Sequence, residues 1–176
     1  MTAQETNEMK TPVRITINGE PYEATVENRL LLVDFIREVA QLTGTHVGCS
    51  VEGRCGVCTV ILDGKAVKSC LMLAVQADGS SVLTIEGLAA AGRLHPIQEA
   101  FWEKHGLQCG FCTPGQMMTL YGLLKSPKRT DEEIREAMSG VLCPCTGYVH
   151  IIEAVKAAMA KVDEMTPAER AALFPL

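Results

Sequence analysis

The first half of the chain alternates apolar and polar residues in short runs, a pattern typical of half-buried β-strands. Residues 13–17 and 22–26 form two such runs, and Asn18-Gly19 between them tolerates the positive φ angles of a tight hairpin turn. Two more runs, 59–62 and 66–67, flank Asp63-Gly64, and residues 82–85 offer a last short strand. The pattern predicts a small sheet made largely of hairpins.

A helical pattern interrupts these strands once. Within residues 30–40, Leu31, Phe35 and Val39 recur at four-residue steps, with Leu32 and Ile36 on the adjoining face. Apolar residues at this spacing line one side of an amphipathic helix. We therefore expect one helix to lie across the sheet.

Beyond residue 88 the strand signals stop and helix-start signals begin. Proline at the first helical position loses no hydrogen bond, which suits Pro96 and Pro114. Thr130 followed by Glu133 matches a capping box. The predicted helices cover residues 96–104, 115–124, 130–138 and 148–162.

These signals divide the chain into a flexible tail at 1–12, a mixed sheet and helix domain at 13–88, an all-helical domain at 89–162 and a surface arm at 163–176. Residues 86–93, rich in Ala and Gly, are interpreted as the linker between the two domains.

Composition narrows the classes of function. Hydrophobic residues make up 47% of the chain and charged residues 21%, which is enough to build a core. The net charge is −5 and the basic residues form no stripe, so we expect no nucleic-acid partner. No apolar run is long enough to span a bilayer, and residues 1–12 carry no signal core. The sequence thus predicts a cytoplasmic protein without a membrane partner, where cysteines stay reduced.

The placement of the cysteines is the main chemical signal. They form two groups of four, and four thiolates complete one tetrathiolate metal site. The candidate metal ligands are Cys49, Cys55, Cys58 and Cys70 in the first group and Cys109, Cys112, Cys143 and Cys145 in the second.

The first group resembles the plant-type binuclear iron-sulfur spacing, with two cysteines three positions apart, one just upstream and one beyond a hairpin. Gly48, Gly53 and Gly56 surround these cysteines, and glycine permits the tight turns that bring backbone N-H groups close to sulfur. Structural zinc uses similar pairs of close cysteines and is the alternative interpretation.

The second group combines a C-G-F-C unit at 109–112 with a C-P-C unit at 143–145. Pro144 disfavours helix at Cys143, so the C-P-C unit is expected to be extended. Both units precede a predicted helix, whose N-terminal partial positive charge favours thiolate and an anionic cluster. Two differently built quartets in one small chain predict an electron relay.

A resemblance to a known family rests on three strings, G-C-S-V-E-G-R-C-G-V-C-T-V at 48–60 followed by Cys70, Q-C-G-F-C-T-P-G-Q-M-M at 108–118, and L-C-P-C-T-G-Y at 142–148. In this order they resemble the small iron-sulfur subunit of the molybdenum hydroxylases, the xanthine oxidase family. The resemblance covers Val13 to Val162.

The resemblance implies an α+β protein, in which a plant-ferredoxin-like β-grasp domain precedes an all-α four-helix domain and each domain holds one [2Fe-2S] cluster. It implies a large partner subunit with molybdopterin, as the cytosine dinucleotide, and a medium partner subunit with FAD, in a heterotrimer or a dimer of heterotrimers. Electrons then pass from molybdopterin through the helical-domain cluster and the ferredoxin-like cluster to FAD or another acceptor. In similar proteins a glutamine and a cysteine approach the pterin, and they map to Gln108 and Cys145.

The chain departs from the family pattern at two places. Five residues separate Cys49 from Cys55, where the family has four, so we expect altered hydrogen bonding to sulfur in this loop. Pro144 stands where these proteins typically have arginine, and the lost positive charge is expected to lower the potential of the neighbouring cluster.

Two other function classes stay open at this point, a zinc-stapled interaction module without a redox role and a standalone ferredoxin serving many partners. The additional helical domain argues against the second. The remaining candidate side chains are interpreted as structural: the Met117-Met118 pair as core or partner interface, and His46, His95, His105 and His150 as surface or packing residues.

Overall fold

The computed structural model describes residues 9–89, 92–125 and 129–174. Within them, five strands form one mixed sheet in the order β2-β1-β5-β3-β4. Its first pair lies antiparallel, β1 also lies parallel to β5, and β3 lies antiparallel to β4 and β5. The strands are β1 (Lys10–Ile17), β2 (Glu20–Glu27), β3 (Thr59–Leu62), β4 (Lys65–Lys68) and β5 (Ser81–Leu83).

Both predicted hairpins are confirmed, and their turn residues show why they form. Asn18 and Gly19 have φ angles of 54° and 89°, and Asp63 and Gly64 have 46° and 80°. Two successive positive φ angles are what a two-residue type I′ turn requires. The first strand begins at Lys10 rather than at residue 13, and most of the predicted tail, residues 1–8, lies outside the described residues.

The helix predicted at 30–40 is a short α-helix, α2 (Leu32–Asp34), continued by a π-helical turn, η1 (Phe35–Val39). The N-H of Ala40 donates to the carbonyl of Phe35 at 3.0 Å, a five-residue step. This wider turn rotates Val39 away from the sheet, where it is 37% exposed, and buries Ala40 instead. The expected four-residue stripe is therefore wrong at its last position.

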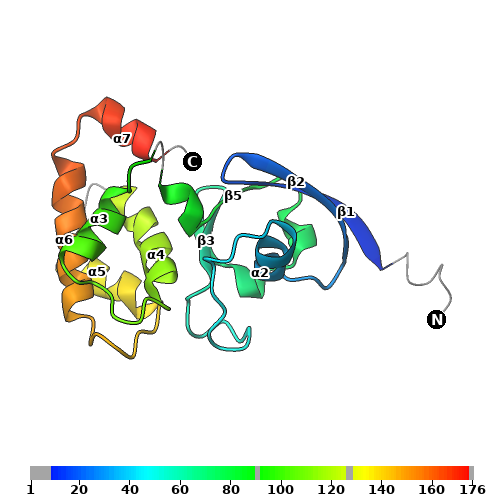
Figure 1. Cartoon of the computed structure of the whole chain (residues 1–176), viewed down its shortest axis with the longest axis horizontal. Helices are drawn as coiled ribbons and strands as arrows, with labels where there is room; N and C mark the ends of the chain where they lie inside the picture. The colour runs from blue at the N-terminus through cyan, green and yellow to red at the C-terminus, as the bar shows by residue number, and fades with distance from the viewer. Residues whose placement is uncertain (1–8, 90–91, 126–128, 175–176) are drawn as a thin grey trace.

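Short 3₁₀ turns complete this half, η2 (Ser69–Leu71), η3 (Ala74–Ala77) and η4 (Ile85–Leu88). The second half is helical, as predicted, with α3 (Pro96–Glu103), α4 (Thr113–Lys125), α5 (Asp131–Ser139) and α6 (Val149–Asp163). Residues 90–91 of the predicted linker lie outside the described residues. Figure 1 shows the sheet and α2 on one side of the molecule and these helices on the other.

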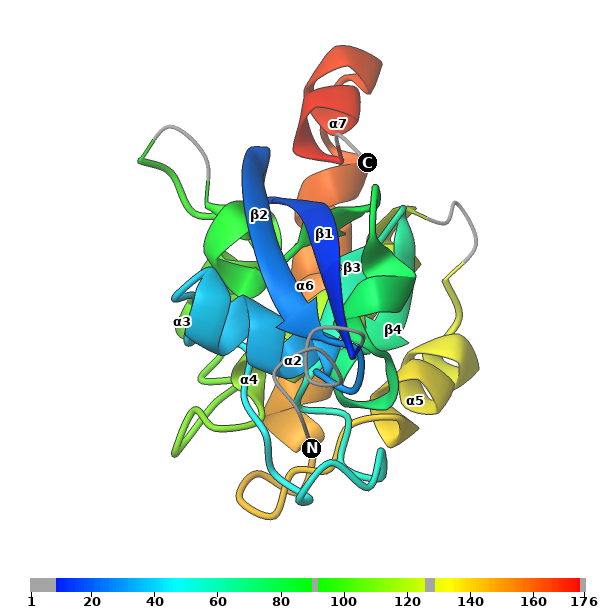
Figure 2. The ribbon, with the colours of Figure 1, turned by 90° about the vertical axis from the view of Figure 1, so that its right-hand side faces the viewer.

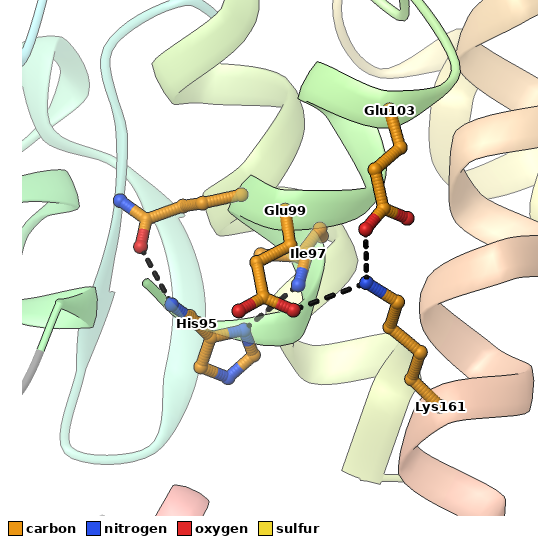
Figure 3. A network of polar contacts seen from close by, with 6 residues as sticks. His95, Ile97, Glu99, Glu103 and Lys161 are labelled. Atoms are coloured by element: carbon orange, nitrogen blue, oxygen red, sulfur yellow. Dashed lines mark hydrogen bonds and ion pairs between the residues drawn. The ribbon is translucent and has the colours of Figure 1, made fainter. Parts of the chain in front are cut away.

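Helix α3 is fixed at its start and along its side (Figure 3). The imidazole Nδ1 of His95 accepts the N-H of Ile97, so this histidine caps the helix. The ammonium of Lys161 on α6 lies 3.0 Å from a Glu99 oxygen and 2.9 Å from a Glu103 oxygen. These contacts hold α3 against α6.

The arm at 163–176 contains a helix that the sequence pattern did not predict, α7 (Pro167–Leu173). A capping box starts it, because Thr166 accepts the N-H of Glu169 and Glu169 accepts the N-H of Thr166. No residue of α7 is fully buried, but the ring of Phe174 lies 5.0 Å from that of Tyr121 on α4. The arm is thus a docked helix on the surface.

One buried cluster joins the two halves at a seam, while the strands and α2 also enclose a core of their own. Val57, Ile61 and Leu83 of the sheet half belong to the same buried cluster as the residues of α3 to α6. Helix α4 contacts β3, and Figures 1 and 2 show the helices stacked against this end of the sheet. Of the predicted ligands, Cys55 in one half and Cys112 and Cys143 in the other belong to this shared cluster.

Among the described residues, no helix combines the length and apolar character needed to cross a membrane.

Candidate metal centres

The eight cysteine thiols are free and come together in four pairs. In the first quartet Cys49 hydrogen-bonds Cys55 and Cys70 hydrogen-bonds Cys58. In the second, Cys112 hydrogen-bonds Cys143, and the Sγ of Cys145 lies 3.4 Å from that of Cys109. Each pair joins cysteines from different segments or from opposite ends of one loop.

The loop of the first quartet absorbs its additional residue by a left-handed turn. Ser50 and Val51 have φ angles of 51° and 61°, and the N-H of Glu52 donates to the carbonyl of Cys49 at 3.2 Å. A positive φ is rare for a β-branched residue, and Val51 is 40% exposed. The insertion therefore bulges outward, away from the thiols.

Backbone donors reach the sulfur of Cys49 in this longer loop. The N-H of Cys55 is the main donor and, with those of Arg54 and Glu52, lowers the pKa of Cys49 to about 7. On the other side of the quartet, burial and the neighbouring thiol of Cys58 raise the pKa of Cys70 to about 12. N-H donors thus favour the thiolate on one side of this site, whereas burial favours the neutral thiol on the other.

The second quartet has an exposed side and a buried side. Cys109 is exposed and Cys145 half-buried, whereas Cys112 and Cys143 are 7% and 8% exposed. The N-H of Phe111 lowers the pKa of Cys109, while burial raises that of Cys112 to about 12.

The C-P-C unit carries its own donors to sulfur. Burial acts to raise the pKa of Cys143, but the hydroxyl of Thr146, 3.4 Å from the sulfur, and the N-H groups of Cys145 and Thr146 outweigh it and lower that pKa. Pro144 is exposed and donates no N-H, so its neighbours supply these contacts. The unit precedes α6 and lies outside any helix, with bends at Pro144 and Cys145.

Paired thiols fit a [2Fe-2S] cluster, in which each iron takes two of the four protein thiolates. A structural zinc site instead gathers four ligands around one ion. The donor set, its pairing and its N-H contacts match two binuclear clusters.

The first quartet meets the buried side of the second through Cys55, which shares a buried cluster with Cys112 and Cys143. The N-H of Leu142 donates to the carbonyl of Cys55 at 2.9 Å, so adjacent residues of the two ligand loops are hydrogen-bonded. A Cβ atom on Gly56 would lie 2.0 Å from the carbonyl oxygen of Gly140, and one on Gly115 would lie 2.6 Å from Cα of Val57. Glycine at these positions lets the two halves approach closely.

Comparison with known proteins agrees with this geometry. Residues 15–91 match the family model of the 2Fe-2S iron-sulfur cluster binding domain, and residues 84–156 match that of the [2Fe-2S] binding domain. The gamma subunit of caffeine dehydrogenase from Pseudomonas sp. (strain CBB1) is 55% identical over 82% of this chain and 88% of its own. A probable xanthine dehydrogenase subunit from Bacillus subtilis (strain 168) is 44% identical over 79% of this chain and 80% of its own.

A solved structure agrees as well. A chain of quinoline 2-oxidoreductase from Pseudomonas putida 86 superposes with a TM-score of 0.81 at 46% identity, covering 86% of this chain and 95% of that one. The chain is a small iron-sulfur subunit of the molybdenum hydroxylase family. It carries two [2Fe-2S] binding domains and is the electron-transfer component of an oxidoreductase with further subunits. The relatives give no support to the zinc-stapled module.

The structure places Gln108 and Cys145 of this iron-sulfur subunit on the exposed side of the second quartet. Gln108 is exposed and directly precedes Cys109, whose sulfur is the partner of Cys145. The two residues proposed to approach a pterin therefore border the same pair of thiols.

Three residues at the seam were missed as site residues. The ring of His46 stacks on that of Phe111 at 4.7 Å, and its Nδ1 lies 2.7 Å from the Phe111 carbonyl oxygen. Gln116 and Tyr148 contact the segment that leads to Cys143. Their only sequence signal is their place inside or beside the cysteine strings, because the contacts join residues that no local pattern brings together.

Restoring a positive charge beside the second quartet gives a test of Pro144 in this subunit. We expect Pro144→Arg to raise the midpoint potential of the helical-domain cluster, because a nearby cation favours the more negative reduced state. Redox titration followed by electron paramagnetic resonance measures both clusters in one sample, and the ferredoxin-domain midpoint is the internal control. An unchanged or lower helical-domain midpoint would contradict the charge argument.

Proposed function

We propose that this subunit receives electrons at the exposed side of the second quartet and delivers them from the first quartet to a different partner. The observation that carries the proposal is the exposure of Cys109 and Cys145 on one side and the burial of Cys112 and Cys143 toward Cys55 on the other. The donor is molybdopterin cytosine dinucleotide on a large subunit, and the acceptor is FAD on a medium subunit.

All eight cysteines serve as cluster ligands in this proposal, two quartets holding one cluster each. The bound clusters supply one-electron redox chemistry, while the chain supplies thiolates, burial and hydrogen bonds that set their potentials. The Leu142 to Cys55 hydrogen bond gives a short connection through backbone atoms between the two ligand sets. The subunit thus carries electrons between two partners, with the second quartet as the entry site and the first quartet as the exit site.

A substitution at Gln108 tests whether electrons enter at the exposed side of the second quartet. We expect Gln108→Ala to slow reduction of the helical-domain cluster by substrate by roughly tenfold, as is usual when a group that orients a redox centre is lost. The exposed position of Gln108 implies that the fold tolerates the change. Stopped-flow spectroscopy of the purified complex measures this step, and reduction by dithionite, which needs no pterin contact, is the control.

The same measurement on Cys145→Ser separates the two roles given to that residue. Loss of the helical-domain signal is expected from its role as a ligand, whereas Gln108→Ala leaves the signal intact. If substrate reduces the Gln108→Ala cluster at the rate of the unchanged protein, the pterin contact of Gln108 is wrong.

The partner assignment rests on relatives whose names denote subunits of larger enzymes, such as a gamma subunit of caffeine dehydrogenase and a subunit of a probable xanthine dehydrogenase. We infer a heterotrimer or a dimer of heterotrimers in the cytoplasm, whose reducing conditions suit eight free thiols. Co-purification from native cells tests this: the expected complex contains molybdenum, flavin and iron. A brown chain that purifies alone and reduces many acceptors would support the standalone ferredoxin instead.

A further inference from the structure

The segment Val141–Cys143, which leads into the C-P-C unit, is held by apolar burial and by hydrogen bonds of its backbone. Val141 is fully buried, whereas the side chain of Leu142 points outward and is 54% exposed. The N-H of Leu142 donates to the carbonyl of Cys55, and the N-H of Cys143 donates to the phenol oxygen of Tyr148 at 2.8 Å. These directional polar contacts add to the burial of Val141 in placing the segment relative to the first quartet.

Two side chains clamp the carbonyl of Val141 from different helices. The amide nitrogen of Gln116 on α4 lies 3.3 Å from the carbonyl oxygen, and the phenol oxygen of Tyr148 lies 3.1 Å from it. Tyr148 thus donates to Val141 while accepting from Cys143. Its φ angle of 65°, at the start of α6, is unusual for a bulky side chain.

Gln116 is an unusual choice for a core position. Its side chain is fully buried, and its amide oxygen finds no hydrogen-bond partner among the described residues. Burying an unpaired polar group costs free energy that an apolar side chain of similar size, such as methionine, would not. Among the described residues, its side chain makes a single hydrogen bond, from the amide nitrogen to the Val141 carbonyl.

We propose that Gln116 and Tyr148 are positioning residues for electron transfer between the two clusters. By sharing the carbonyl of Val141 they hold the Leu142 to Cys55 bond, and with it the buried side of the second quartet, in register with the first. In the transfer, one electron leaves the reduced helical-domain cluster and enters the oxidised ferredoxin-domain cluster. The proposal rests on the proposed ligand sets and on the direction of flow given above.

A double-mutant cycle on the complete subunit tests the shared carbonyl. In Gln116→Met, Val141 keeps Tyr148 as a partner, and in Tyr148→Phe it keeps Gln116, so each single change is expected to be mild. The double variant leaves the carbonyl without either partner, and its effect is expected to exceed the sum of the two. We expect roughly a tenfold faster hydrogen exchange of the Leu142 amide in the double variant, with little change in the single variants.

Cluster spectroscopy supplies the second readout. The magnetic interaction between the two reduced clusters is expected to weaken in the double variant, while both signals and the iron content stay. Tyr121→Phe is the matched control, because its hydroxyl, also on a buried residue of α4, has no hydrogen-bond partner among the described residues. It should leave exchange and magnetic interaction unchanged.

Unchanged exchange at Leu142 in the double variant, or effects that merely add, would overturn the proposal. If the double variant does not fold, the Tyr148→Phe variant is the test. Hydrogen exchange of the Cys143 amide must then be faster, because this N-H loses its acceptor. An unchanged exchange rate at Cys143 would contradict the proposed clamp. If the chain instead proves to hold no clusters, the spectra show this directly, while the exchange measurements still judge the clamp.

Discussion

Replacing Cys143 with serine is expected to abolish the helical-domain iron-sulfur signal and to leave the ferredoxin-domain signal in place. Serine keeps the size of the side chain but does not supply the thiolate that binds iron. Cys143 is also the buried neighbour of Cys112. The other thiols in the described part of the chain are already assigned as ligands, so none is available to take its place. Iron and sulfide should fall by about half, because two matched cluster domains are present.

The reciprocal variant is the control for this result. Cys70→Ser, which removes the buried partner of Cys58, should abolish only the ferredoxin-domain signal. Electron paramagnetic resonance of dithionite-reduced protein distinguishes the two signals in each sample. Loss of both signals from either single variant would mean that the quartets do not act as separate sites, and a colourless parent protein containing zinc would contradict the cluster assignment altogether.

Introducing a methyl group at Gly56 is expected to separate the two halves of the molecule. In Gly56→Ala the new Cβ would lie 2.0 Å from the carbonyl oxygen of Gly140, a backbone atom that has no flexible way to move. The residue also has a φ angle of 70°, where alanine is strained. Strain and overpacking together are expected to cost roughly 3 kcal/mol or more, which corresponds to a fall of roughly 6 °C or more in the thermal midpoint.

The Gly79→Ala variant is the control that separates backbone strain from the close contact with Gly140. Gly79 has a φ angle of 75°, but a Cβ there would meet no atom within 4 Å. Its expected cost is only the backbone strain of about 1 to 2 kcal/mol. Thermal unfolding compares the two variants, and exchange at the Leu142 amide, which bonds Cys55 beside Gly56, should rise only in Gly56→Ala. Equal midpoints for the two variants would show that the Gly56 contact does not hold the halves together.

Local signals predicted most of the secondary structure. The two hairpins followed from residue pairs suited to positive φ, and helices α3 to α5 followed from proline and capping positions. Helix α7 was missed although Thr166 and Glu169 form a capping box. Its apolar pattern is short and did not indicate that it packs against the helical domain. The π turn after α2 was missed for a different reason, since Val39 continues a four-residue spacing that the five-residue bond at Ala40 breaks.

The amino-acid sequence by itself determined the chemistry of this subunit. Ligand type, ligand number and the order of the three cysteine strings are properties of residues and their spacing, and they led to two iron-sulfur quartets in one family. The α+β fold followed from the same local patterns, because turns and caps depend on a few neighbouring residues.

Only the tertiary structure decided how the two quartets are arranged. Leu142 meets Cys55 and Gly56 meets Gly140 across the seam, and Gln116 reaches Val141 within the helical half. These contacts depend on how the helices pack against the sheet, and no local preference encodes them. The same packing exposes Cys109 and buries Cys143, so the second quartet has one side toward solvent and one side in the core.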